Sequence, residues 1–137
     1  RDPLLDLSVG DICSRDFLAL SEGQTVQEAL EALRQTDHTV FLVRSEQGKR
    51  PGVVSLADLR LAFQDREMSM LLTLGDLVDD SSRERLFPWA SLRDGVRLFT
   101  RIEKEGVAVY RSEAENWPIG IVTRASILQA YRAQKTE

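Results

Sequence analysis

The chain of 137 residues is long enough for one domain, or for two small halves that share one core. Its 42% hydrophobic and 29% charged residues exclude disordered and fibrous proteins, and its net charge of -4 argues against nucleic-acid binding, which needs a basic surface. One cysteine and one histidine exclude an intrachain disulfide and a zinc cluster, so the sequence predicts a small globular module without a metal site.

The first half of the chain predicts a strand, a helix, two strands and a second helix. Residues 17–20 form a short apolar run that suits a strand. From Thr25 onward, apolar residues at helical spacing follow a T-x-x-E capping box and predict a helix. The β-prone runs 40–43 and 53–54 flank a polar loop and predict a hairpin, and Ser55 then begins the second helix.

The second half predicts the same order of elements. Residues 86–87 give a weak strand signal, because a proline follows them. A helix begins at Ser91, the runs 107–110 and 119–122 predict paired strands, and Thr123 opens the last helix. The fold class predicted from these elements is α+β, built from two β-α-β-β-α units.

Two local features lie outside this simple pattern. Gly95 lies inside a predicted helix, where it costs about 1 kcal/mol relative to alanine. The apolar stretch 68–74 is expected to join the two halves and to bury Leu71, Leu72 and Leu74 against them. The alternative is an apolar patch that binds a partner.

The two halves are copies of one pattern. Landmarks of the first half recur in the second at a separation that grows from 65 to 68 residues, as expected for a duplicated unit with small insertions. The matching pairs are 8–12 with 73–77, 25–28 with 91–94, 44–46 with 111–113, and 52–55 with 120–123. The predicted repeats are residues 1–67 and residues 68–137.

This pattern resembles a tandem pair of CBS domains, the arrangement known as a Bateman module. The resemblance rests on the V/L-G-D-I/L openings and on the closing motifs, Gly-Val-Val-Ser-Leu-Ala-Asp-Leu at 52–59 and Gly-Ile-Val-Thr-Arg-Ala-Ser-Ile at 120–127. It implies two repeats packed about a pseudo-twofold axis, a regulatory module that is not an enzyme, and a homodimer. It also implies clefts between the repeats, which in the family bind AMP, ADP, ATP or S-adenosylmethionine. The expected ligand here is AMP, ADP or ATP, as a regulatory ligand and not as a cofactor.

By this resemblance the candidate nucleotide-binding residues are Ser55, Asp58, Thr123, Ser126 and His38. The Ser55 hydroxyl and the helix start would face a phosphate, and the Asp58 carboxylate would accept hydrogen bonds from ribose hydroxyls. Thr123 corresponds to Ser55, but Ser126 stands where the family has aspartate, and a serine holds only one ribose hydroxyl. His38 is expected at the mouth of the cleft.

The residues themselves leave a structural alternative open. S-x-x-D is also a helix-capping pattern, and the chain uses such patterns at Thr25 and Ser91, where no ligand is proposed. The basic residues near the motifs are either phosphate contacts or solvated charges: Lys49, Arg50, Arg60 and Arg124. Cys13 and His38 lack a third orienting group, so no catalytic residue is predicted.

In the general character of residues 54–60, 88–92 and 127–132, the chain resembles the cytoplasmic C-terminal region of a bacterial ClC-type voltage-gated chloride channel or transporter. This likeness implies a cytoplasmic domain, attached to an inner-membrane protein, whose nucleotide modulates that protein. No uncharged run exceeds eight residues, so no membrane span is predicted within this sequence. The alternative function is a ligand-free module that dimerises a membrane transporter or a metabolic enzyme.

Overall fold

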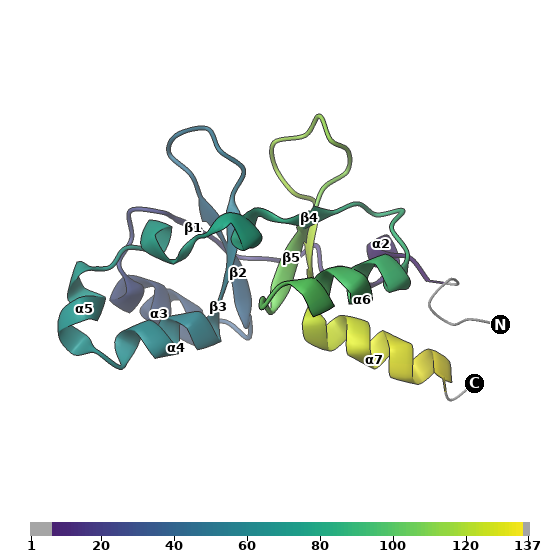
Figure 1. The fold of residues 1–137 in the computed structure, drawn as a ribbon. Coiled ribbons are helices and arrows are strands. Elements are labelled where there is room, and N and C mark those ends of the chain that lie inside the picture. The colour runs from purple at the N-terminus through teal and green to yellow at the C-terminus, as the bar shows by residue number, and fades with distance from the viewer. Residues whose placement is uncertain (1–6, 136–137) are drawn as a thin grey trace.

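The computed structural model describes residues 7–135, and within them each half has the predicted order of elements (Figure 1). The predicted outer ends of the repeats, residues 1–6 and 136–137, lie outside the described residues. The first half contains β1 (Ala19–Ser21), α3 (Val26–Arg34), β2 (Val40–Arg44), β3 (Gly52–Ser55) and α4 (Leu56–Phe63). The second contains β4 (Arg85–Leu86), α6 (Leu92–Arg101), β5 (Gly106–Val109), β6 (Gly120–Thr123) and α7 (Arg124–Lys135).

Each half forms a three-stranded sheet of the same topology. In the first sheet β1 pairs with β2 in parallel, and β2 pairs with β3 in an antiparallel hairpin. The second sheet repeats this order, and its register also matches, since Val40 faces Ser55 in one hairpin and Gly106 faces Thr123 in the other. The α+β fold of two β-α-β-β-α repeats is therefore confirmed, with the halves related by an approximate twofold axis.

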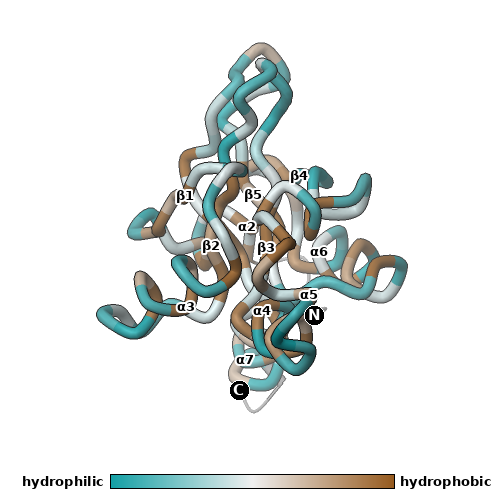
Figure 2. The backbone as a smooth tube through the Cα atoms, turned by 90° about the vertical axis from the view of Figure 1, so that its left-hand side faces the viewer, coloured by the Kyte–Doolittle hydropathy of each residue, from teal (hydrophilic) through white to brown (hydrophobic). Residues whose placement is uncertain are grey.

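Alternating side chains of the strands build three layers of core. Phe41, Val43 and Val54 pack under the helices α3 and α4 of the first half. Their neighbours in sequence point the opposite way and meet the second sheet, because successive strand residues face opposite sides. These inner residues are Val40, Leu42, Val53, Ala108, Tyr110 and Ile121. Figure 2 shows that the strands are mostly brown, and so hydrophobic, whereas the hairpin loops are mostly teal, and so hydrophilic.

Short segments at the start of each half pack onto the other half. The helix α2 (Val9–Ile12) lies against the second half, where the Val9 N–H donates to the Ala90 carbonyl at 2.7 Å. The 3₁₀ turn η1 (Leu74–Leu77) lies against the first half, where the Leu74 N–H donates to the Gln24 carbonyl at 2.8 Å. The boundary at residue 67/68 stays a prediction about the sequence, since each core includes a segment of the other half.

The joining stretch differs in part from its prediction. Leu74 is buried and Leu72 is partly buried as expected, but Leu71 is 79% exposed. The cause is the helix α5 (Arg66–Leu71), which buries Ser69. Because each helical residue turns by about 100°, a side chain two positions after Ser69 points toward solvent.

Gly95 has a packing role that its helical position alone does not indicate. A Cβ atom at this residue would lie 2.5 Å from Cδ1 of Ile127, which is 2% exposed. The glycine therefore lets α6 and α7 approach closely. None of the described helices is both long enough and apolar enough to cross a membrane.

Candidate functional site

A pocket of about 320 Å³ lies where the first turns of α4 and α7 meet. Ser55 and Arg60 line it from the first half, and Glu105 and Thr123 line it from the second. Because both halves contribute, the pocket lies between the repeats, at the helix end of the two sheets. Each helix start adds a partial positive charge of about half a unit, which favours an anion there.

The start of α4 is closed by a reciprocal capping box. The Asp58 N–H donates to Ser55 Oγ at 3.1 Å, and the Ser55 N–H donates to Asp58 Oδ2 at 3.0 Å. The capping interpretation of Ser55 and Asp58 thus describes contacts that are present. Within the described chain no hydrogen bond engages Asp58 Oδ1, so this oxygen remains available to a ligand.

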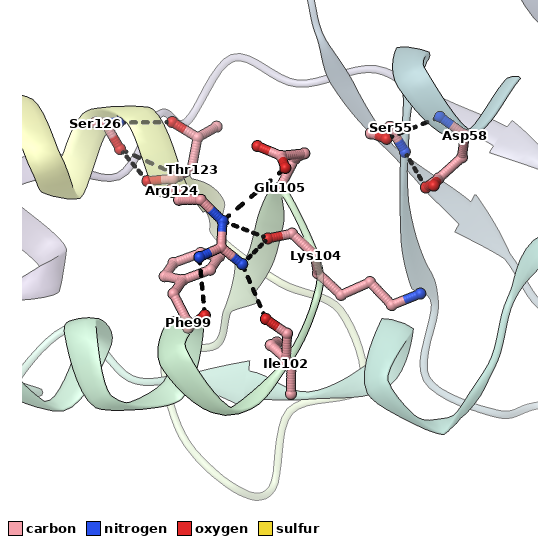
Figure 3. Close-up of polar contacts among 9 residues, drawn as sticks. All are labelled: Ser55, Asp58, Phe99, Ile102, Lys104, Glu105, Thr123, Arg124 and Ser126. Atoms are coloured by element: carbon pink, nitrogen blue, oxygen red, sulfur yellow. Dashed lines mark hydrogen bonds and ion pairs between the residues drawn. The ribbon is translucent and has the colours of Figure 1, made fainter. Parts of the chain in front are cut away.

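The start of α7 is closed differently, because serine replaces aspartate. The Ser126 N–H donates to Thr123 Oγ1 at 3.0 Å, and the Thr123 N–H donates to Ser126 Oγ at 3.1 Å. The Ser126 hydroxyl also donates its proton to the Thr123 carbonyl at 2.8 Å. Ser126 therefore has no proton left for a ligand, whereas Asp58 keeps one carboxylate oxygen (Figure 3).

His38 lines a neighbouring pocket of about 480 Å³ beside α3 and α4. The two pockets adjoin, since Thr39, Leu56 and Arg60 line both of them. The imidazole is mostly buried, and its Nε2 lies 4.0 Å from Asp16 Oδ1. Of the predicted site residues, the structure brings Ser55 and Thr123 into one pocket and His38 into the next.

Asp58 and Ser126 line neither of these two pockets, because their side chains turn back onto the helix caps. Their role in binding stays a prediction, as does that of the other three candidates. For Asp58 the prediction now requires that a ligand approach from outside the pocket, along the first turn of α4.

The Arg124 guanidinium is held by backbone carbonyls and is not simply a solvated charge. Its Nη1 donates to the Phe99 carbonyl at 2.8 Å, and its Nη2 donates to the carbonyls of Ile102 and Lys104, both at 2.9 Å (Figure 3). The guanidinium also lies 5.2 Å from the centre of the Phe99 ring. Arg124 therefore ties the start of α7 to the end of α6, which leaves Arg60 as the arginine that lines the pocket.

Two pocket residues, Thr39 and Glu105, were missing from the sequence prediction. Their carbonyls accept hydrogen bonds from the first N–H groups of the two helices, Leu56 at 2.8 Å and Arg124 at 2.9 Å. The internal repeat could have indicated both residues, since Thr39 directly precedes β2 and Glu105 directly precedes β5, the equivalent strand of the second half. The Glu105 carboxylate repels anions, so an anionic group is expected nearer to Ser55 and Arg60.

Comparisons with known proteins agree with this architecture. The family model for the CBS domain matches residues 9–65, and no curated protein sequence matched the chain. The CBS-pair protein CBSX2 from Arabidopsis thaliana is 25% identical, with 96% of this chain and 98% of that chain covered and a TM-score of 0.70.

Two further solved structures carry nucleosides or nucleotides. A CBS domain pair in complex with 5′-methylthioadenosine and S-adenosyl-L-methionine is 17% identical, with 93% of this chain and 97% of that chain covered and a TM-score of 0.75. The CBS domain of a bacterial CNNM/CorC family Mg²⁺ transporter, in complex with ATP, is 15% identical, with 94% and 89% covered and a TM-score of 0.73. The chain thus has the fold of a tandem CBS domain pair.

Proposed function

We propose that this tandem CBS pair is a regulatory, non-catalytic module that binds an adenine nucleotide, AMP, ADP or ATP, between its repeats. The observation that carries the proposal is the pocket shared by Ser55 and Thr123, at which one helix start from each half is directed. A ligand in this position contacts both halves at once. Its affinity therefore depends on their relative arrangement, and binding biases that arrangement and the attached protein with it.

The charges around the pocket support an orientation for the nucleotide. We place its phosphates at the start of α4, beside Ser55, because the helix N-terminus and the Arg60 side chain are both electropositive there. From the pocket the nucleotide extends along the first turn of α4, where the free Asp58 Oδ1 is an acceptor for a ribose hydroxyl. The complexes of related folds with AMP and with ATP support the ligand class.

Calorimetric titration with AMP, ADP, ATP and S-adenosylmethionine tests the proposal. We expect one adenine nucleotide to bind per chain. Arg60→Gln should lower the affinity for each nucleotide, most for ATP and least for AMP, because ATP carries the largest phosphate charge. Absence of binding by every member of the panel at millimolar concentration would contradict the proposal.

Asp58→Ala separates the ligand role from the capping role. We expect it to weaken nucleotide binding by about tenfold, or roughly 1.4 kcal/mol, and Ser126→Ala to have a much smaller effect. The matched control is Asp94→Ala, which removes an equivalent capping carboxylate at α6, with N–H to oxygen distances of 3.1 Å. Both aspartate variants lose about 1 kcal/mol of stability, but only Asp58→Ala is expected to lose affinity. Equal affinities would refute the assignment of Asp58.

We further propose a membrane transport protein of the ClC chloride channel type as the host, with this module as its cytoplasmic domain. The resemblance of residues 54–60, 88–92 and 127–132 to the ClC cytoplasmic region supports a chloride channel or transporter as host. The CBS domain of a Mg²⁺ transporter, which has the same fold, supports a transport protein as host. Reading the whole gene tests this proposal. Membrane-spanning segments typical of a chloride channel are expected beside this segment, and a metabolic enzyme in their place would contradict it.

A second candidate function, assembly of the host, is favoured by apolar side chains on the surface of α4 and α5. Leu61, Met68, Met70 and Leu71 are all exposed there. A homodimer that covers these side chains would bury apolar surface without using the nucleotide pocket. Light scattering over the micromolar range is expected to give a dimer mass, reduced to a monomer by Leu61→Lys with Leu71→Lys. A monomeric mass for the unaltered chain would contradict this candidate.

A further inference from the structure

The hairpin loops emerge at the end of the sheets opposite α4 and α7 (Figure 1). Three arginines lie close together near this end, since two of them exchange hydrogen bonds and the third lies against the Tyr110 ring. Arg50 belongs to the loop before β3, Arg83 to the 3₁₀ turn η2 (Asp80–Arg83), and Arg85 to β4. Arg50 Nη2 donates to the Arg83 carbonyl at 3.0 Å, and Arg83 Nε donates to the Arg50 carbonyl at 3.1 Å. This reciprocal pair holds together segments from the two halves of the chain.

Within the described part of the chain, none of these three arginines forms an ion pair with a carboxylate. The ion pairs there involve other basic groups. Arg85 Nη1 donates to the Glu113 carbonyl at 3.4 Å, so each guanidinium engages one nitrogen with a backbone oxygen. A guanidinium carries five N–H donors, and most of these therefore have no acceptor among the described residues.

Tyr110 lies between the sheets at the same end. Its side chain is 1% exposed, and its hydroxyl is a buried polar group without a hydrogen-bond partner in the described chain. The Arg85 guanidinium lies 5.4 Å from the centre of the Tyr110 ring. Burial raises the pKa of the Tyr110 phenol, and the positive charges of Arg50 and Arg85 oppose that rise, which places both charges within electrostatic reach of the hydroxyl.

We propose that Arg50, Arg83, Arg85 and the Tyr110 hydroxyl form a binding site for a small tetrahedral oxyanion of the phosphate class. Such an anion offers only acceptors, and its oxygens match the forked donors of arginine. It would neutralise the three charges and accept the proton of the Tyr110 hydroxyl in a hydrogen bond. Because this hydroxyl is enclosed, a compact anion reaches it only when the guanidinium groups above it move apart.

This site is separate from the nucleotide pocket. Arg50 precedes β3 at its Gly52 end, whereas Ser55 closes the strand at the helix end. Three residue steps of a strand span about 10 Å, so the two sites lie at opposite ends of the sheets. Because Arg50 comes from one half and the other three residues from the other half, the bound anion would fasten the repeats together.

Thermal unfolding of the 137-residue chain tests the site, with inorganic phosphate titrated against sodium chloride at matched ionic strength. We expect phosphate to raise the unfolding temperature more than chloride does, because only the folded chain presents the site. Arg50→Gln and Arg85→Gln are expected to lose most of this phosphate-specific rise. Arg97→Gln, which removes an exposed positive charge on α6 outside both sites, is the matched control and is expected to keep it.

Tyr110→Phe gives a second, independent expectation. In chloride the variant should be at least as stable as the unaltered chain, because it removes an unsatisfied buried hydroxyl. In phosphate it should gain less stability than the unaltered chain. A large loss of stability in chloride would show that the hydroxyl has a partner, and would overturn its role in the site.

Phosphorus NMR supplies a measurement that needs no variant. Broadening of the inorganic phosphate signal by the chain, retained when AMP is added in excess, is expected. A sharp signal would overturn the anion site, and broadening abolished by AMP would move it to the nucleotide pocket. Failure of AMP to bind leaves this outcome unchanged, so the two proposals can fail separately.

Discussion

Gly95→Ala tests the close contact between α6 and α7, the helix whose start lines the proposed pocket. In an open helix the substitution would stabilise the fold by about 1 kcal/mol. Here the new Cβ atom would lie 2.5 Å from Cδ1 of Ile127, a side chain that is 2% exposed and enclosed by the core. Overpacking of this kind costs about 1–3 kcal/mol, so we expect Gly95→Ala to be neutral or destabilising by as much as about 2 kcal/mol.

Ile127→Val removes the one atom that causes the clash. Alone it should cost about 0.5–1.5 kcal/mol, as shortened core side chains do. In the double variant the closest remaining atoms would be Ile127 Cγ1 at 3.7 Å and Val9 Cγ2 at 3.8 Å, which are ordinary contacts. The alanine introduced by Gly95→Ala then keeps its helical advantage and fills the vacated space. The double variant should therefore exceed Ile127→Val in stability by about 1 kcal/mol.

Urea unfolding of the four proteins measures this cycle, with the slope of each transition as a check on two-state behaviour. We expect the two substitutions to be coupled favourably by at least about 1 kcal/mol. If Gly95→Ala alone stabilises the chain by about 1 kcal/mol and the two effects simply add, the packing reason for the glycine is wrong.

Three other expectations follow from individual contacts. Arg124→Leu should lower stability by about 2–4 kcal/mol, since it removes donors from three carbonyls, whereas Arg60→Leu on the surface should change it by about 0.5 kcal/mol or less in urea unfolding. Burial raises the pKa of the Cys13 thiol, so alkylation of the folded chain at neutral pH should be slower than that of an unfolded control, and equal rates would contradict this. Leu74→Ala should lower the free energy of unfolding by about 2–5 kcal/mol, and calorimetry should show both halves unfolding together in one transition at a lower temperature. Two separate transitions would refute a core shared by the halves.

The repeated elements could be predicted because they carry periodic signals. The helix that follows Thr25 shows an apolar stripe and a capping box, and the strands show β-prone runs, so their bounds agree with the structure to within a few residues. The segments α2 and η1 were not predicted, because four residues are too short for a periodic pattern. Their partners also lie in the opposite half of the sequence.

The site was predictable only in part, for a similar reason. Ser55 and Thr123 follow from the repeated motif, which by symmetry brings them to one place. The role of Arg124 depends on carbonyl groups 20 to 25 residues away, in α6 and just after its end, and nothing local in the sequence indicates them. Glu105, which gives the pocket its charge asymmetry, likewise depends on the contact between the halves.

The exchanged opening segments have a consequence for a single repeat. One half expressed alone would carry an opening segment, α2 or η1, that packs on the other half. It would also expose the surface that the other half's opening segment covers in the pair. Two such molecules could exchange segments, so the covalent pair is equivalent to a domain-swapped dimer on one chain. The stretch between α4 and η1 then acts as a tether that keeps each half at a high effective concentration around the other.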